Sequence, residues 1–229
     1  MNDQADVQVT GLYVTFAALF VVLLITSNVI AVKIIEVGGR ILPAAIILFP
    51  MTYILGDVLT EVYGLRLARR VIWLGFLGNG VAVLGFWISG LLPAAPFWGN
   101  QDSYVAILGY TPRLLAASFA GYLAGELVNS TVLSRMKVAT QGRWLWSRTI
   151  ASTLVGQGVD SAVFITGAFA GTMAGGDLVE LLITLWLVKV GYEALATPLT
   201  YVVVGYVKRK EGIDVYDRQV SFNPFAFRG

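Results

Sequence analysis

The chain has 229 residues, of which 57% are hydrophobic and only 13% charged, with a net charge of +2. Soluble domains average about 25% charged residues, so this composition and its recurrent apolar runs indicate a helical membrane protein with several spans. The sequence has no cysteine and no histidine, which excludes disulfides and removes the commonest transition-metal ligands and proton relay; we therefore expect neither a cofactor nor a metal site.

Six apolar segments are long enough to cross a bilayer as helices. They cover residues 12–35, 41–64, 70–92, 112–135, 149–172 and 178–207. Between the third and fourth segments, residues 102–110 can form either a short interfacial helix capped by Asp102 or an irregular loop. We predict an all-α membrane protein, a six-transmembrane-helix bundle over residues 11–207, with a cytoplasmic N-terminal segment (1–10) and a cytoplasmic C-terminal tail (208–229).

Basic residues mark one side of this bundle. They follow the second, fourth and sixth segments, at Arg66, Arg69, Arg70, Arg135, Lys137, Arg143, Arg148, Lys208, Arg209 and Lys210. The connections on the opposite side hold a single cation, Arg40. By the positive-inside rule, both termini are expected in the cytoplasm.

Two acids lie near the cytoplasmic end of the second segment, where Asp57 and Glu61 share one helical face. Negative charge at a helix C-terminus opposes the macrodipole, so these acids need cations, and Arg66, Arg69 and Arg70 follow directly. We predict that the five residues form a charge cluster that closes the inner face as a gate. Asp57, the deeper acid, could still reach the substrate path.

Four further ionisable residues lie deeper in the predicted spans: Glu126, Asp160, Lys189 and Glu193. Each costs at least ~2.5 kcal/mol at membrane depth, so each needs a partner or a function. At a rise of 1.5 Å per residue, Asp160 and Lys189 both fall near the midplane. We therefore predict an Asp160–Lys189 ion pair, which is either purely structural or borders a ligand cavity.

Polar side chains share helical faces with these charges or lie in the first segment; they are Asn28, Asn129, Gln157 and Tyr192. Singly, such groups commonly hydrogen-bond between helices. Their convergence at one depth predicts a polar cavity inside the bundle.

Small and kinking residues bear on how the helices pack. Gly121 and Gly125 have the spacing that lets helices approach closely, whereas Pro50 and Pro198 are expected to kink the second and sixth segments. Glycine-rich faces favour a homodimer, although six helices can also enclose a small cavity as a monomer.

The chain resembles the queuosine precursor transporter family in a series of segments that follow one another along its length. They include TSNVIAVK (26–33), GDVLTEVYG (56–64), GELVNSTVLSRMK (125–137), STLVGQGVDSAVF (152–164) and KVGYEALATPLTY (189–201). The resemblance implies a multi-pass inner-membrane protein of bacteria or archaea that imports 7-deazaguanine bases, such as the 7-cyano and 7-aminomethyl forms, for tRNA modification. It implies a transporter and not an enzyme, with a purine-like base and the lipid bilayer as partners and no direct contact with nucleic acid.

A guanine-like base has adjacent N1–H and 2-amino donors, which a carboxylate can accept. Under this resemblance, that edge would meet Glu126, or else Asp160 with Gln157. The rest of the polar wall and a stacking surface would come from Asn28, Asn129, Lys189, Tyr192 and Glu193. The residues alone do not decide which acid meets which atom.

Other readings stay open at this point. A substrate-binding subunit of an energy-coupling-factor vitamin importer also has about six spans, but Ala17, Ala18 and Ala31 of the first segment lack the AxxxA spacing usual in those subunits. A membrane enzyme or a purely structural bundle is disfavoured, because the carboxylates have no His, Cys or metal-ligand cluster beside them and the buried charge load is high. Proton coupling, sodium coupling and facilitated diffusion are not separated.

Overall fold

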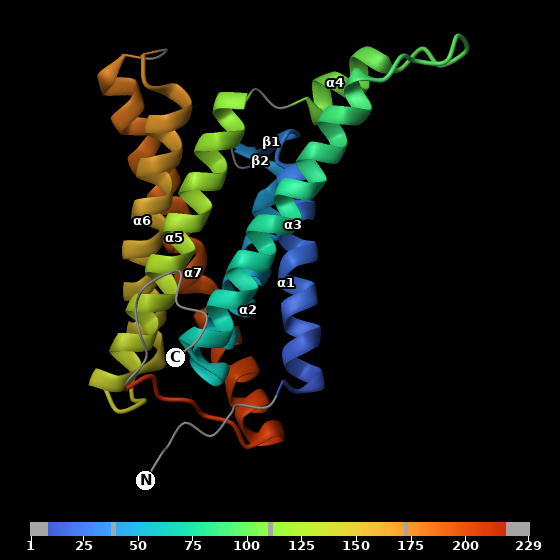
Figure 1. Ribbon diagram of the computed structural model, residues 1–229. Coiled ribbons are helices and arrows are strands. Elements are labelled where there is room, and N and C mark those ends of the chain that lie inside the picture. Colours follow the sequence, from blue (N-terminus) through green and yellow to red (C-terminus); the bar gives the residue numbers. More distant parts are fainter. Residues whose placement is uncertain (1–8, 38–39, 110–111, 172–173, 219–229) are drawn as a thin grey trace.

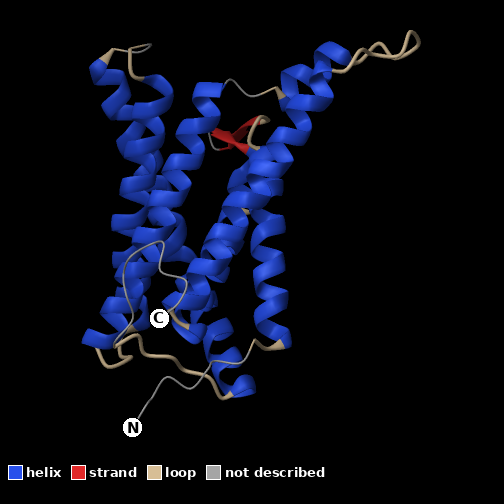
Figure 2. Ribbon diagram, viewed as in Figure 1, coloured by secondary structure: helices blue, strands red, loops and turns tan. Residues whose placement is uncertain are grey.

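The structure is a computed structural model that describes residues 9–37, 40–109, 112–171 and 174–218 (Figure 1). These residues are almost entirely helical, with a single-turn 3-10 helix at Ala44–Ile47 and one short hairpin (Figure 2). The helices are α1 (Gly11–Ile30), α2 (Phe49–Tyr63), α3 (Leu65–Leu91), α4 (Gln101–Leu108), α5 (Pro112–Ala139), α6 (Leu145–Phe169) and α7 (Gly175–Glu211). The all-α prediction is confirmed.

The long helices form two groups that lie side by side. α5 packs most extensively against α6, and α6 contacts α7, whereas α1 packs against both α2 and α3. The groups are joined because α2 contacts both α7 and α5, and α3 contacts α5 (Figure 1). α2 is therefore placed to present side chains to α5 and α7.

The connection between α1 and α2 is an antiparallel hairpin, where we predicted helix ends. β1 (Ile34–Val37) pairs with β2 (Arg40–Pro43), so the predicted segments 12–35 and 41–64 both extend too far. The isoleucines and valine here are β-branched and favour strands, and a glycine pair between them favours a tight turn. These strand residues are apolar, so the predicted membrane spans on either side included them.

α2 begins later than expected, which changes the role of Pro50. This proline lies in the first turn of α2 instead of mid-span, where its missing N–H is one that a helix leaves unbonded in any case. The predicted kink at Pro50 is therefore wrong. Pro198 does lie inside α7, and the kink there stays a prediction.

The other helices agree with the predicted segments and continue past them at their basic ends. α3 begins at Leu65, before the predicted residue 70, and α7 runs on to Glu211. The last turn of α7 holds three cations, which complement the helix macrodipole. The helical alternative for residues 102–110 is confirmed as α4, although Asn100 and not Asp102 occupies the N-cap position.

The bundle is apolar outside and polar within. Large exposed hydrophobic side chains lie on α1, α3, α6 and α7, and by length and composition α1 and α3 could each cross a membrane. Buried polar side chains lie mainly on α2, α5, α6 and α7. Hydrocarbon cannot hydrogen-bond to polar groups, so a site for a polar ligand is expected in the interior of the bundle.

An apolar core holds α2 in place on one side. It lies where α1, α2, α3 and the C-terminal half of α7 meet, and includes Tyr13, Val58 and Val207. On another side, Thr60 of α2 donates a hydrogen bond of 3.1 Å to Ser130 of α5. These contacts fix which face of α2 is turned toward the polar interior.

Candidate functional site

Charged side chains from four helices meet about half-way along the bundle. Asp57 of α2, Glu126 of α5 and Glu193 of α7 are close enough to interact electrostatically, as are Glu126 and Asp160 of α6. We call the following residues the central polar cluster: Asp57, Glu126, Asn129, Asp160, Lys189 and Glu193. Its members come from the four helices that carry most of the buried polar side chains.

Glycines allow the helices to approach at this level. A Cβ placed on Gly56 would lie 2.8 Å from Glu126 Oε1, and one on Gly125 would lie 2.5 Å from Asp160 Cβ. Real Cβ atoms do not approach so closely, so the predicted tight packing at Gly121 and Gly125 is confirmed. This glycine face is used within the chain, against α6, which removes the reason for expecting it to join two copies; the homodimer stays a prediction.

Several acceptors in the cluster are buried without a donor. Glu193 has no exposed surface, Asp57 is 1% exposed and Asn129 is 7% exposed. Both carboxylate oxygens of Glu193, Oδ2 of Asp57 and Oδ1 of Asn129 have no hydrogen-bond partner among the described residues. A buried polar group left unsatisfied costs about 1–3 kcal/mol, so this arrangement suits a ligand that presents several N–H or O–H donors.

The lysine of the cluster is already paired. Lys189 donates a hydrogen bond to Asp160 Oδ2, with side chains 20% and 19% exposed respectively. The predicted Asp160–Lys189 ion pair is confirmed. In the part of the chain that the structure describes, no lysine or arginine forms an ion pair with the cluster's other three carboxyls, those of Asp57, Glu126 and Glu193.

Three other residues were predicted to line the site. Gln157 is 6% exposed and lies one turn before Asp160 on α6, whereas Tyr192 is half-buried beside Glu193 on α7. Asn28 is half-buried in the last turn of α1. Their contact with a ligand stays a prediction. Asp57 was placed with the gate, but it is one turn deeper than Glu61 and belongs to the central polar cluster.

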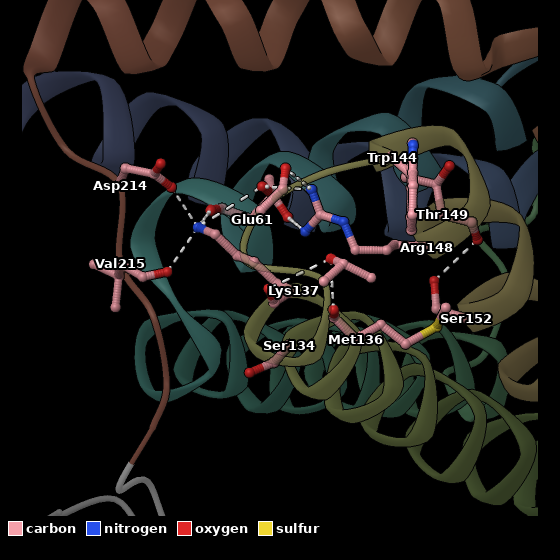
Figure 3. A network of polar contacts seen from close by, with 12 residues as sticks. Glu61, Ser134, Met136, Lys137, Trp144, Arg148, Thr149, Ser152, Asp214 and Val215 are labelled. Carbon is pink, nitrogen blue, oxygen red and sulfur yellow. Dashed lines mark hydrogen bonds and ion pairs between the residues drawn. The ribbon is translucent and has the colours of Figure 1, made fainter.

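A second polar site lies where α2 ends (Figure 3). Glu61 accepts two hydrogen bonds from the Arg148 guanidinium, of 2.5 and 3.1 Å, and one of 2.8 Å from Lys208. Lys137 Nζ lies 3.7 Å from Glu61 Oε1 and donates to the Glu61 backbone carbonyl. Asp214 pairs with both lysines, at 2.5 and 2.9 Å. We call these five residues the buried charge network, because Glu61, Lys137 and Arg148 are each 1% exposed.

The cations that pair with Glu61 differ from those expected from proximity in the sequence. Arg66, Arg69 and Arg70 lie in the first turns of α3, whereas the partners of Glu61 come from α5, α6 and α7. Those partners are 76, 87 and 147 residues away along the chain. The predicted need of Glu61 for cations is thus met across helices, with a two-bond guanidinium–carboxylate contact that is stronger than a single point contact.

The segment after α7 folds back over this end of the bundle. Val215 N–H donates to the Val62 carbonyl at 3.1 Å, and Asp217 Oδ2 accepts from Leu65 N–H at 2.8 Å and from Ser134 at 2.5 Å. Gly64, between α2 and α3, has φ of 84°, and a Cβ there would lie 2.7 Å from Val215 Cγ1. Only glycine readily adopts this positive φ and also leaves room for the Val215 side chain, because it has no Cβ.

The predicted terminal segments are described in part. The tail at 208–229 starts as the last turn of α7 and continues as the packed segment through Arg218. Residues 219–229 of that tail, and residues 1–8 of the N-terminal segment, lie outside the described residues.

Asp214 is the most exposed member of the buried charge network. Burial alone would raise the pKa of Asp214, but hydrogen bonds and charges from Lys137 and Lys208 outweigh burial and lower this pKa below its ordinary value. A lowered carboxyl pKa contributes stability above the unfolded pKa of about 3.9, and this contribution is lost as the pH falls through the folded pKa.

Asp214→Asn should therefore lower the unfolding temperature near pH 7 and change it progressively less as the pH falls below about 4. The measurement is thermal unfolding of both proteins in the same detergent from pH 7 to pH 3. The effect should be modest, because the side chain is 42% exposed and exposed pairs are screened by solvent. An equal difference at every pH would contradict the assigned role of these ion pairs.

Within the described ranges, no group of three or more acidic, histidine or cysteine side chains is arranged to hold a metal ion. The chain has an apolar exterior, a polar centre reached by four helices and a buried, charged end. These are features of a helical membrane protein with a polar interior, and they fit the class of membrane transporters.

Comparison with known proteins agrees with this class. The family described as "Putative vitamin uptake transporter" matches residues 43–203, and the chain belongs to this family. A "Probable queuosine precursor transporter" of Bacillus subtilis (strain 168) is 27% identical over 180 residues, 77% of this chain and 78% of the relative. The "Queuosine precursor transporter" of Escherichia coli (strain K12) is 27% identical over 156 residues, 66% of each chain.

These relatives confirm the resemblance found in the sequence motifs, and they are transporters, in agreement with the prediction that the chain is not an enzyme. No solved structure is significantly similar to the chain.

Proposed function

We propose that this protein imports queuosine precursors, 7-deazaguanine bases such as the 7-cyano and 7-aminomethyl forms, across a bacterial or archaeal inner membrane. The observation that carries the proposal is the central polar cluster, in which several buried acceptors lack donors among the described residues. The chain's curated relatives are named queuosine precursor transporters. The imported base would serve tRNA modification inside the cell.

The chemistry of the base suits the cluster. Its N1–H and 2-amino group are adjacent donors that one carboxylate can accept together, and hydrogen bonds to charged groups contribute about 1.5–3 kcal/mol each. Glu126, or else Asp160 with Gln157, is the proposed partner of this edge. Lys189 and the amide of Asn129 can donate to the carbonyl oxygen O6, and Tyr192 offers a ring to stack on the base.

The proposed topology has six membrane spans formed by α1, α2, α3, α5, α6 and α7, with α4 at the outer surface. The ends of α5 and α7 that carry the buried charge network are rich in lysine and arginine, so the positive-inside rule supports a cytoplasmic location for that end and for both termini. The transport unit would cover residues 11–207, flanked by the two cytoplasmic segments.

Alternating access follows from the two polar sites. The central polar cluster would hold the base, and the buried charge network would close the cytoplasmic end. Release of the base into the cell would require α2 to separate from α5, α6 and α7 at Glu61, where Arg148 and Lys208 now hold it. In that cytoplasm-open state, the outer end of the bundle would be closed.

A counterflow assay in proteoliposomes tests the proposal, with labelled 7-deazaguanine outside and unlabelled base inside. We expect specific exchange that guanine analogues lacking the 2-amino group inhibit poorly, because the carboxylate then loses a donor. Folded protein that shows no specific exchange would overturn the proposal. Copurification with an ATPase module would favour the energy-coupling-factor alternative instead, to which the vitamin-uptake description of the family draws attention.

Substitutions in the cluster should weaken binding. We expect the Kd for the base to rise about tenfold to a hundredfold in at least one of Glu126→Gln, Asp160→Asn, Lys189→Met and Glu193→Gln, in keeping with the loss of one charged hydrogen bond. The matched control is Glu180→Gln, at an exposed position on the same helix as Glu193. Unchanged affinity in all four variants would place the binding cavity elsewhere.

A further inference from the structure

Asp57 of α2 and Glu193 of α7 form a pair of buried carboxyls inside the central polar cluster. Asp57 and Glu193 are close enough to interact electrostatically, and neither side chain is more than 1% exposed. Oδ2 of Asp57 and both carboxylate oxygens of Glu193 have no hydrogen-bond donor among the described residues. Two carboxylate oxygens cannot hydrogen-bond to each other unless one of them carries a proton.

Among the residues that the structure describes, no cation forms an ion pair with Asp57 or Glu193. Glu126 of α5 interacts with both members of the pair, and Tyr53 of α2 interacts with Glu193. Tyr122 of α5 and Asp160 of α6 interact in turn with Glu126. The one ammonium of the cluster, that of Lys189 on α7, is bonded to Asp160. Four carboxyls thus share one lysine, so full ionisation would leave the cluster with three uncompensated negative charges in a region of low dielectric constant.

Asn129 of α5 gives a second, independent indication that something binds here. Its side chain lies near Asp57, it is 7% exposed, and its carbonyl oxygen Oδ1 has no donor among the described residues. A proton on the Asp57–Glu193 pair and the donors of a bound base would together satisfy the acceptors that this site leaves open.

We propose that Asp57 and Glu193 hold one proton between them and that the protein carries this proton inward with each molecule of base. This inference rests on the proposed function and adds its energy source. The proton enters from water on the outer side and bonds to a carboxylate oxygen of the pair, and the resulting O–H donates to the other carboxyl. When the cytoplasmic side opens, the O–H bond breaks, the proton passes to water and the pair regains its charge.

The coupling predicts a specific dependence on the pH gradient. For one proton and a neutral base, with the membrane potential held at zero, a one-unit gradient that is acidic outside can concentrate the base at most about tenfold inside, because tenfold corresponds to about 1.4 kcal/mol. Proteoliposomes containing a pH-sensitive dye should also acidify inside when the base is added outside.

The test compares the wild-type protein with Asp57→Asn, whose amide cannot carry the proton, and with the matched control Asp177→Asn, at an exposed site in the first turn of α7. The wild type and the control should both accumulate 7-deazaguanine above equilibrium and give the dye signal. Whatever exchange rate Asp57→Asn retains, its accumulation ratio should fall to one and its dye signal should vanish.

The wild-type measurement decides the proposal even if the variant does not fold. Wild-type vesicles that exchange labelled base in counterflow, but show neither accumulation with a proton gradient nor a dye signal, would overturn proton coupling and leave the transport function intact. Accumulation driven by a sodium gradient alone would also overturn it. A lack of any counterflow would instead overturn the proposed function.

Discussion

Glu61→Gln should destabilise the protein by about 3–5 kcal/mol, the range found when one partner of a buried ion pair is removed. Arg148 and Lys137 are each 1% exposed. The neutral amide would leave Arg148 without a carboxylate partner among the described residues and Lys137 with Asp214 alone. The amide can still accept a hydrogen bond, so the loss reports the charge and not the shape of the side chain.

Thermal unfolding in detergent measures this effect. For a chain of this size, we expect the unfolding temperature to fall by on the order of 10 °C, whereas Glu36→Gln, at an exposed position in the hairpin, should leave it nearly unchanged. Glu61→Gln/Arg148→Met should cost less than Glu61→Gln alone, because the double variant removes a stranded cation together with its partner.

The affinity for the base should change little in the folded fraction of Glu61→Gln, because Glu61 lies at the end of the bundle and not in the central polar cluster. Turnover should fall, since the network is the proposed cytoplasmic gate. A stable Glu61→Gln protein with a selective loss of affinity would instead place Glu61 in the binding site.

Gly125→Ala should reduce both stability and binding. The new methyl carbon would lie 2.5 Å from Asp160 Cβ and 2.9 Å from the Gly156 carbonyl oxygen, so α5 and α6 must move apart. Overpacking of this kind costs about 1–3 kcal/mol. The movement would also displace Asp160 relative to Lys189, which disturbs the ion pair at the proposed site.

The control for this substitution is Gly205→Ala on α7, where a Cβ meets nothing within 4 Å. That change should stabilise the helix by about 0.5–1 kcal/mol, the usual gain when alanine replaces glycine within a helix. Unfolding temperature and base affinity should both fall in Gly125→Ala and neither should fall in Gly205→Ala. Equal behaviour of the two variants would show that α5 and α6 do not need this close approach.

Helical structure and the positions of the polar residues were largely predictable from the sequence. Apolar runs of span length and the spacing of Glu126, Asp160 and Glu193 are local properties, because a helix places residues three and four apart on one face. The helical rise of 1.5 Å per residue placed Asp160 and Lys189 at similar depth, which led to the prediction of the ion pair between them. The hairpin was missed because strand-forming residues beside a glycine pair are as apolar as the spans they join.

The partners of the charges depended on tertiary structure. In the sequence, Glu61 lies five to nine residues before Arg66, Arg69 and Arg70. The cations that contact Glu61 in the structure come instead from α5, α6 and α7. Proximity along a chain says little about contact between helices, because packing brings together residues as far apart as Glu61 and Lys208, 147 positions along the chain.

The sequence by itself determined a helical membrane protein of a transporter family with ionisable residues in its interior, since composition, periodicity and motifs are written along the chain. Only the tertiary structure decided that these residues divide into two sites. Asp57 and Glu61, one helical turn apart on α2, belong to different sites because α5 and α7 present Glu126 and Glu193 to the first, whereas α6 and α7 present Arg148 and Lys208 to the second.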